Sequence, residues 1–269
     1  MAPLRCVYCD LDGTLVGRGG SLLHDGAGEP TLLGMRAVEA CVRAGVELVL
    51  VSGRRRVTVE QPARLLGQPS FIYESGAAVV LDGEEHWLTG GIVPVNGRTV
   101  FDQITATGAP ELLLSHYAGR LEYHAPWHVG REVSHLFRGR IDAAEADALL
   151  AAHGHERLRV VDNGIIHPPV ADRELRAYHL VPSTASKAAG VAFHQRARGY
   201  APEECIAIGD SREDLGMAAS VGAFWLVANA LEEDPSAAEA VTENVRFAEG
   251  RQGAGVHEAV VTELAERRG

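Results

Sequence analysis

Apolar and polar positions alternate in two different ways along this chain of 269 residues. Toward both ends, short runs of consecutive apolar residues are separated by longer segments whose apolar residues recur with helical spacing. Continuous apolar runs are typical of strands buried on both faces, and intervening helices connect parallel strands. The pattern therefore predicts a parallel sheet with helices on both faces.

Five apolar runs are expected to form the strands of this sheet, and the segments between them are expected to be helical. The expected strands cover residues 5–9, 46–51, 70–73, 205–208 and 224–227. The expected helices cover residues 31–44, 57–66, 186–198, 213–221 and 256–267, and a further helix is expected to open at Asp234 and Pro235. Thr31 is the predicted N-cap of the first helix.

The middle of the chain follows the second pattern. Apolar and polar residues alternate in strand-like pieces at 120–124 and 158–161, and a capping box predicts a helix over 142–153. This alternation is typical of an antiparallel sheet with one open face. The sequence therefore predicts a Rossmann-like α/β core formed by residues 1–91 and 183–269, with an α+β cap domain inserted at 92–182.

Composition narrows the class of protein. The chain is 46% hydrophobic and 23% charged, as expected for a globular protein, and its formal net charge is −11. This charge argues against nucleic acid or an anionic membrane as the main partner. No apolar run is long enough to span a membrane and no signal peptide is recognised, so a cytoplasmic location is expected. The four cysteines have no spacing typical of zinc sites and are expected to be buried core residues.

Polar residues follow several of the predicted strands, although the strands themselves are apolar. Asp10 and Asp12 end the first strand, Ser52 follows the second, and Asp210 follows the strand 205–208. Lys187 lies at the start of a predicted helix. Ligands of open parallel sheets bind at the carboxyl ends of the strands, so these side chains are expected to converge on one crevice.

The residue types suit phosphoryl transfer. A carboxylate can attack phosphorus, but like charges ~4 Å apart repel by about 4 kcal/mol at an effective dielectric constant of about 20. A lysine and a divalent cation would offset this repulsion, and Mg²⁺ prefers oxygen ligands such as Asp10 and Asp210. Ser52 and the backbone amides of the turn at 10–13 could bind phosphate oxygens.

Four ordered motifs resemble those of the haloacid dehalogenase-like phosphohydrolases. They are DLDGTL at 10–15, VSGR at 51–54, Lys187, and GDSRED at 209–214. The position of the insertion, between the second and third motifs, resembles the C2B-type cap of the Cof-like and sugar-phosphate phosphatase branch. The resemblance therefore implies a Rossmann-like core with a cap that closes over the active site.

The resemblance also implies a role for each motif residue. Asp10 would be the nucleophile and Asp12 the general acid and base, with the backbone carbonyl of Asp12 as a metal ligand. Ser52, Gly53, Gly13 and Lys187 would bind the phosphoryl group. Asp10 and Asp210 would ligate Mg²⁺, and Asp214 would be a further carboxylate near the metal or would orient Lys187.

Two features of the site are not determined by the resemblance. Glu213 stands where this branch often has asparagine. The glutamate adds a negative charge near a phosphate site, which is unfavourable unless the side chain points away or meets a cation such as Arg212. Substrate contacts are expected from Arg54 in the core and from a histidine-rich cap segment, in which the candidates are His124, Trp127, His128 and Arg131. Ordinary surface positions are the alternative interpretation of these cap residues.

The resulting hypothesis is a Mg²⁺-dependent phosphomonoester hydrolase that acts through an aspartyl phosphate. Its expected partner is a small phosphorylated metabolite, such as a sugar phosphate or a glycosyl-phosphoglycerate, and its oligomeric state is left open. A phosphomutase of the same capped type is the first alternative. A non-catalytic protein that binds a phosphorylated ligand is the second, although every catalytic position is filled in this sequence.

Overall fold

A large, mainly parallel sheet forms the centre of the protein, which a computed structural model describes over residues 2–166 and 175–267. The strand order is β12-β11-β10-β1-β2-β3-β4-β5, and all neighbours are parallel except at the antiparallel end formed by β4 and β5. The strands are β1 (Cys6–Asp10), β2 (Glu47–Val51), β3 (Phe71–Tyr73), β4 (Ala78–Leu81), β5 (Glu84–Trp87), β10 (Cys205–Gly209), β11 (Ala223–Leu226) and β12 (Val245–Phe247). All five predicted strands are confirmed, and β4, β5 and β12 are additional.

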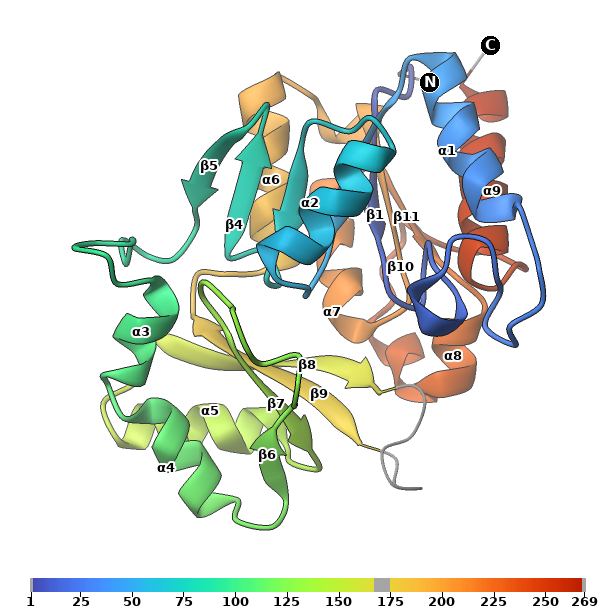
Figure 1. The fold of residues 1–269 in the computed structure, drawn as a ribbon. Coiled ribbons are helices and arrows are strands. Elements are labelled where there is room, and N and C mark those ends of the chain that lie inside the picture. The colour runs from blue at the N-terminus through green and yellow to red at the C-terminus, as the bar shows by residue number, and fades with distance from the viewer. Residues whose placement is uncertain (1, 167–174, 268–269) are drawn as a thin grey trace.

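Helices cover both faces of this sheet (Figure 1). Alternate residues of β1 and β2 point to opposite faces, so each face has its own apolar cluster. One cluster joins Val7 and Leu50 to the helices α1 (Leu33–Ala44), α2 (Arg56–Leu65) and α9 (Gln252–Glu266). The other joins Tyr8 and Val51 to α6 (Lys187–Arg198) and to the 3-10 helix Gly216–Ser220. The predicted α/β core is therefore confirmed.

A second, antiparallel sheet lies beside the core and has the strand order β6-β7-β9-β8. Its strands are β6 (Leu121–Tyr123), β7 (His135–Gly139), β8 (Leu158–Ile165) and β9 (Arg176–Pro182). One face packs on α3 (Val100–Thr105), α4 (Ala109–His116) and α5 (Ala143–Ala152). The chain enters this unit after β5 and returns to the core at α6, so it is an inserted α+β cap. The boundaries 92–182 stay a prediction, and residues 167–174 within them lie outside the described residues.

Two helices predicted in the C-terminal half differ from the structure. The helix expected over 213–221 is a four-residue helix, α7 (Arg212–Leu215), which continues as the 3-10 helix Gly216–Ser220. Glycine at position 216 has a poor helix propensity, which favours this change of geometry. The segment after Asp234 is likewise a short 3-10 helix, Pro235–Ala240, and it follows α8 (Asn229–Glu233).

The ends of two helices also differ from the prediction. Leu32 is the N-cap of α1, although the Thr31 hydroxyl accepts a hydrogen bond from the Leu33 amide at 3.2 Å. The last helix begins at Gln252, earlier than predicted, despite two glycines in its first turn. A methyl group at Gly253 would lie about 3.0 Å from the backbone of Gly34 in α1. Close helix packing therefore favours glycine where helix propensity disfavours it.

The structure bears on two general predictions about the chain, those on its cysteines and on membrane-spanning helices. Its four cysteines, Cys6, Cys9, Cys41 and Cys205, are free thiols and all are buried, as expected. Within residues 2–166 and 175–267, no helix combines the length and the apolar character that a membrane span requires.

A buried carboxylate joins the cap to the core. Glu74, in the turn after β3, is fully buried and has a positive φ of 46°. Its two oxygens accept hydrogen bonds from the backbone amides of Glu132, Val133 and Ser134 and from the Ser134 hydroxyl, at 2.5–3.1 Å. The guanidinium Nε of Arg131 lies 3.6 Å from the same carboxylate. Charge and hydrogen bonding thus fix one cap loop to one core turn.

Replacing this carboxylate is expected to destabilise the protein strongly. Glu74→Ala leaves Arg131 and three amides without their acceptor, and breaking a buried ion pair in this way costs about 3–5 kcal/mol. Urea unfolding followed by circular dichroism measures the loss of unfolding free energy. Glu84→Ala, at an exposed position of β5, is the matched control. Equal losses in the two variants would contradict the assigned role of Glu74.

Candidate active site

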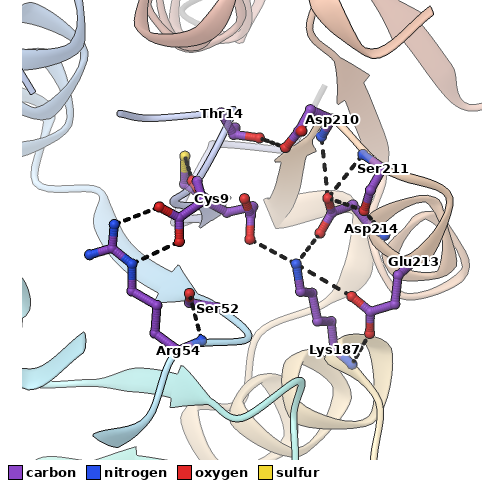
Figure 2. A network of polar contacts seen from close by, with 11 residues as sticks. Cys9, Thr14, Ser52, Arg54, Lys187, Asp210, Ser211, Glu213 and Asp214 are labelled. Atoms are coloured by element: carbon purple, nitrogen blue, oxygen red, sulfur yellow. Dashed lines mark hydrogen bonds and ion pairs between the residues drawn. The ribbon is translucent and has the colours of Figure 1, made fainter. Parts of the chain in front are cut away.

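A buried ion pair connects the first strand of the core to the start of α6. Asp10 ends β1 and is 4% exposed, and Lys187 opens α6 and is 2% exposed. The Lys187 Nζ donates to Asp10 Oδ1 at 2.7 Å (Figure 2). Ser186 caps α6 by accepting a hydrogen bond from the Ala189 amide at 3.0 Å, which fixes where Lys187 leaves the backbone.

Two further carboxylates surround the same ammonium group. Lys187 Nζ lies 2.6 Å from Asp214 Oδ1 and 3.3 Å from Glu213 Oε2 (Figure 2). Burial alone would lower the pKa of Lys187, but Asp10, Asp214 and Glu213 outweigh it and hold this pKa well above its usual value. The cation that compensates Glu213 is thus Lys187, which also places its backbone amide 3.3 Å from Glu213 Oε1.

Asp214 is held in place by the start of its own helix. Its Oδ2 accepts hydrogen bonds from the backbone amides of Asp210 and Ser211 and from the Ser211 hydroxyl, at 2.6–3.2 Å. In return, the Asp214 amide donates to Ser211 Oγ, which completes a capping box. Only Oδ1 remains for Lys187, so the geometry favours Asp214 as the residue that orients this lysine.

The turn after β1 lies against Asp210 at the end of β10. The Thr14 hydroxyl donates to Asp210 Oδ1 at 2.5 Å. Gly13 has a φ of 82°, and a methyl group there would collide with the Asp210 carboxylate. The Asn229 side chain donates to the Gly13 carbonyl at 3.0 Å and steadies the turn. Glycine is therefore required at position 13 by conformation and by space.

The donor set fits a divalent cation. Asp10, Asp210 and Asp214 each offer a carboxylate oxygen, and these atoms lie within 4.8 Å of one another. With Glu213, four carboxylates face the single ammonium of Lys187, so negative charge is in excess. Burial, together with the neighbouring carboxylates, raises the pKa of Asp10 and of Asp210 well above the usual range. A cation bound by oxygen ligands would offset this excess.

Ser52, Gly53 and Arg54 follow β2, whose last residue pairs in register with Asp10. Ser52 is 1% exposed, and its hydroxyl accepts a hydrogen bond from the Arg54 amide at 3.1 Å. The Ser52 amide already donates to the Ile72 carbonyl at 3.0 Å, so the Ser52 hydroxyl and the Gly53 amide are the groups of this strand end that could bind phosphate oxygens. The second motif is therefore placed beside the first, as the parallel sheet predicts.

Asp12 and Arg54 form a bidentate ion pair at the rim of the site. Arg54 Nε donates to Asp12 Oδ2 at 2.7 Å, and Nη2 donates to Oδ1 at 2.5 Å (Figure 2). The Asp12 side chain remains 55% exposed, in contrast to Asp10. Both oxygens of Asp12 thus accept a hydrogen bond from Arg54.

The four candidate residues of the cap differ in their surroundings. Arg131 is buried; it donates to the Ser134 hydroxyl at 2.8 Å and to the Gly53 carbonyl at 2.5 Å. These contacts favour a structural role for Arg131. His124 and His128 are partly buried, and each has an Nδ1 without a hydrogen-bond partner among the described residues. Burial lowers the pKa of His124 to about 4, and Trp127 is 59% exposed.

Three polar residues at the junction between core and cap were not singled out as site residues from the sequence. Glu74 anchors the cap loop, and His179 and Asn163 lie next to Gly53. A methyl group at Gly53 would be 3.0 Å from His179 Nε2 and 3.2 Å from Asn163 Oδ1. No local motif marks these residues, because their partners are distant in the sequence. The one available signal is the position of His179 between the apolar residues Tyr178 and Leu180.

Comparisons with known proteins agree with this geometry. The family model of the haloacid dehalogenase-like hydrolases matches residues 167–250 of this chain. A phosphoglycolate phosphatase of Pyrobaculum neutrophilum is 30% identical over 257 residues, which cover 95% of this chain and 94% of that protein. One of Methanoculleus marisnigri is 28% identical over 243 residues, covering 89% and 91%. The chain belongs to the haloacid dehalogenase-like hydrolases, and it is a phosphatase of that family.

Solved structures share the complete fold. The sucrose-phosphatase from Synechocystis, determined with sucrose and phosphate, has a TM-score of 0.65 at 15% identity and covers 97% of this chain and 98% of its own. A haloacid dehalogenase-like hydrolase from Bacteroides thetaiotaomicron has a TM-score of 0.63 at 17% identity, covering 96% and 99%. Core and cap therefore occur together in these structures, as in this chain.

The carboxylate cluster predicts a thermal response to divalent cations. Binding at one hundred times the dissociation constant stabilises a protein by about 2.7 kcal/mol, so Mg²⁺ is expected to raise the Tm by several degrees. Asp210→Asn is expected to abolish most of this rise, because it weakens one ligand. Differential scanning calorimetry with and without Mg²⁺ measures the effect, and Glu111→Gln on α4 is the control. A full response in Asp210→Asn would contradict this site.

Proposed function

We propose that this chain is a Mg²⁺-dependent phosphomonoester hydrolase that forms an aspartyl phosphate on Asp10. The observation that carries the proposal is the position of Asp10. It ends a buried strand, one of its oxygens is fixed by Lys187 at 2.7 Å, and Ser52 lies beside it on the neighbouring strand. A carboxylate held in this way has one oxygen free for attack on a phosphoryl group bound by Ser52, Gly53 and Lys187.

The first step would transfer the phosphoryl group to the protein. Asp10 attacks phosphorus, a new bond forms between its carboxylate oxygen and phosphorus, and the bond from phosphorus to the ester oxygen breaks. Asp12, protonated for this step, gives its proton to the departing oxygen, which leaves as an alcohol. Because Arg54 donates to both oxygens of Asp12, we expect this ion pair to separate when Asp12 gives its proton to the departing oxygen.

The second step would return the protein to its starting state. Asp12, now a carboxylate, accepts a proton from a water molecule whose oxygen attacks phosphorus. The bond between phosphorus and Asp10 breaks, inorganic phosphate leaves, and Asp12 is protonated again. One residue thus serves as acid and then as base, which requires that Asp12 stay accessible to water, consistent with its 55% exposure.

The metal in this proposal is Mg²⁺, held by Asp10, Asp210 and the backbone carbonyl of Asp12. When bound, it would neutralise charge on the phosphoryl oxygens and reduce their repulsion from Asp10. Asp214 would act through Lys187, because its Oδ2 is occupied by three donors of its own helix. Thr14 would keep Asp210 oriented toward the site through its 2.5 Å hydrogen bond.

The proposed substrate is a small phosphorylated metabolite, and 2-phosphoglycolate is the first compound to test. Its support is the relative from Pyrobaculum neutrophilum, named phosphoglycolate phosphatase, which matches 95% of this chain at 30% identity. Sugar phosphates and glycosyl-phosphoglycerates, expected from the type of cap, belong in the same panel. We place the reaction in the cytoplasm, where such metabolites are found.

Phosphate release across a panel of phosphomonoesters tests the hydrolase proposal. Release from at least one compound is expected with Mg²⁺ and is expected to disappear with a chelator. Asp10→Asn should lower kcat by about 10⁴-fold or more, since the nucleophile is lost. Glu111→Gln, at an exposed position of α4 in the cap, is the control and should retain wild-type kcat. Activity of Asp10→Asn close to wild type would exclude the aspartyl phosphate.

The same assay separates the hydrolase from its two rivals. A phosphomutase would release little phosphate and would need a sugar bisphosphate as activator, so a second series contains a hexose bisphosphate with a hexose monophosphate. Isomerised sugar phosphate without release of inorganic phosphate would identify the mutase. Tight binding of a phosphorylated compound with neither reaction would identify a binding protein.

A further inference from the structure

A second polar cluster lies at the amino ends of three neighbouring core strands, away from the candidate active site. Cys6, Glu47 and Cys205 are the first residues of β1, β2 and β10, and Cys6 pairs in register with both of the others. Register partners point to the same face of a sheet, here the face that α6 covers. Asp10 lies four residues further along β1, roughly 13 Å away at the rise of a strand.

His194 of α6 meets this row of strand residues from above. Its side chain is fully buried, and its Nε2 has no hydrogen-bond partner among the described residues, although Glu47 Oε1 lies only 3.4 Å away. The other ring nitrogen, Nδ1, is 2.9 Å from the Tyr8 hydroxyl. A buried polar atom without a partner is unfavourable. The free Nε2 of His194 therefore points to a missing ligand.

The distances between the donor atoms suit a metal ion. One ligand atom from each of Cys6, Glu47 and His194 lies within 4.8 Å of the other two. Zinc bonds of about 2.0–2.3 Å place tetrahedral donors about 3.3–3.6 Å apart, and the separation of His194 Nε2 from Glu47 Oε1 already has this value. A thiolate, an imidazole and a carboxylate are typical zinc ligands, whereas the oxygen donors of the candidate active site suit Mg²⁺.

The charges around this cluster also favour a cation. Burial would raise the pKa of Glu47, but its polar and charged neighbours lower it to about 2, so the side chain is a carboxylate. Arg198 Nη2 donates to Glu47 Oε1 at 3.0 Å. The same guanidinium also donates to both oxygens of Asp82, at 2.6 and 2.7 Å. One arginine thus faces two carboxylates, and a negative charge remains that a bound cation would offset.

We propose that Cys6, Glu47 and His194 form a second metal site, which binds a divalent cation of the zinc type. Cys6 binds as a thiolate and gives its proton to solvent. His194 binds as a neutral ring through Nε2, while its Nδ1–H donates to the Tyr8 hydroxyl, which orients the ring. Because the ligands belong to β1, β2 and α6, the cation ties this helix to the sheet. Occupancy of the site does not depend on the proposed hydrolase activity.

Cobalt is the probe that distinguishes this site from the carboxylate cluster. A thiolate bound to Co²⁺ gives a charge-transfer band in the near ultraviolet, and oxygen ligands do not. The titration uses the Asp210→Asn protein with saturating Mg²⁺ and a phosphine reductant, so that the carboxylate cluster is blocked and the thiols stay reduced. The expected result is a band that saturates at a single equivalent of Co²⁺ and disappears when Zn²⁺ is added.

Variants of the cluster test which side chains hold the cation. Cys6→Ala is expected to abolish the band. Cys41→Ala removes another buried thiol, which belongs to the apolar cluster on the opposite face, and should leave the band unchanged. His194→Phe keeps a ring but removes the nitrogen donor, and should weaken Co²⁺ binding by at least about tenfold. His194→Phe decides the question if Cys6→Ala does not fold.

Thermal unfolding gives a second measurement that needs no spectroscopic probe. In the Asp210→Asn protein with saturating Mg²⁺, Zn²⁺ at one hundred times its dissociation constant should raise the Tm by several degrees. The rise should vanish in Cys6→Ala and persist in Cys41→Ala. A folded parent protein without the cobalt band, a band that persists in Cys6→Ala or His194→Phe, or an equal loss in Cys41→Ala would overturn the proposed site.

Discussion

The buried ammonium of Lys187 is the charge on which the arrangement of the site depends. An unpaired ammonium group costs several kcal/mol inside a protein, so it is stable only where carboxylates meet it. Its partners come from the end of β1 and from α7, and Lys187 itself starts α6. These three elements must therefore meet at one edge of the sheet, and the arrangement of the candidate site follows from the same requirement that stabilises the core.

The same edge carries more negative charge than Lys187 can neutralise, and this excess explains the rest of the site. Asp210 contributes a further carboxylate, which Thr14 holds and Gly13 closely approaches. Locally unfavourable charge is typical of functional sites, where a ligand supplies the compensation. A divalent cation beside a phosphate dianion meets both needs, because the cation offsets the carboxylates and also screens the phosphate from them.

How far the sequence predicts this structure depends on how local the determining contacts are. Strand ends bearing Asp10, Ser52 and Asp210 follow from apolar runs and a parallel sheet, so the core site could be anticipated. The strand β12 has three residues, with arginine at its centre, and gives no clear periodicity. Glu74 resembles an ordinary surface turn residue in sequence. Its burial and positive φ arise from contacts with the cap loop almost 60 residues away in the chain.

The contact between cap and core is less predictable from the sequence than the core motifs, because it depends on one side chain shared between the two sheets. Arg131 is held by Glu74 and donates to the Gly53 carbonyl. A single guanidinium thus connects the turn after β3 to the segment that follows β2. The residues that attach the cap also contact the segment that follows Ser52, so the interaction that stabilises the joint also sets the position of the cap beside that segment.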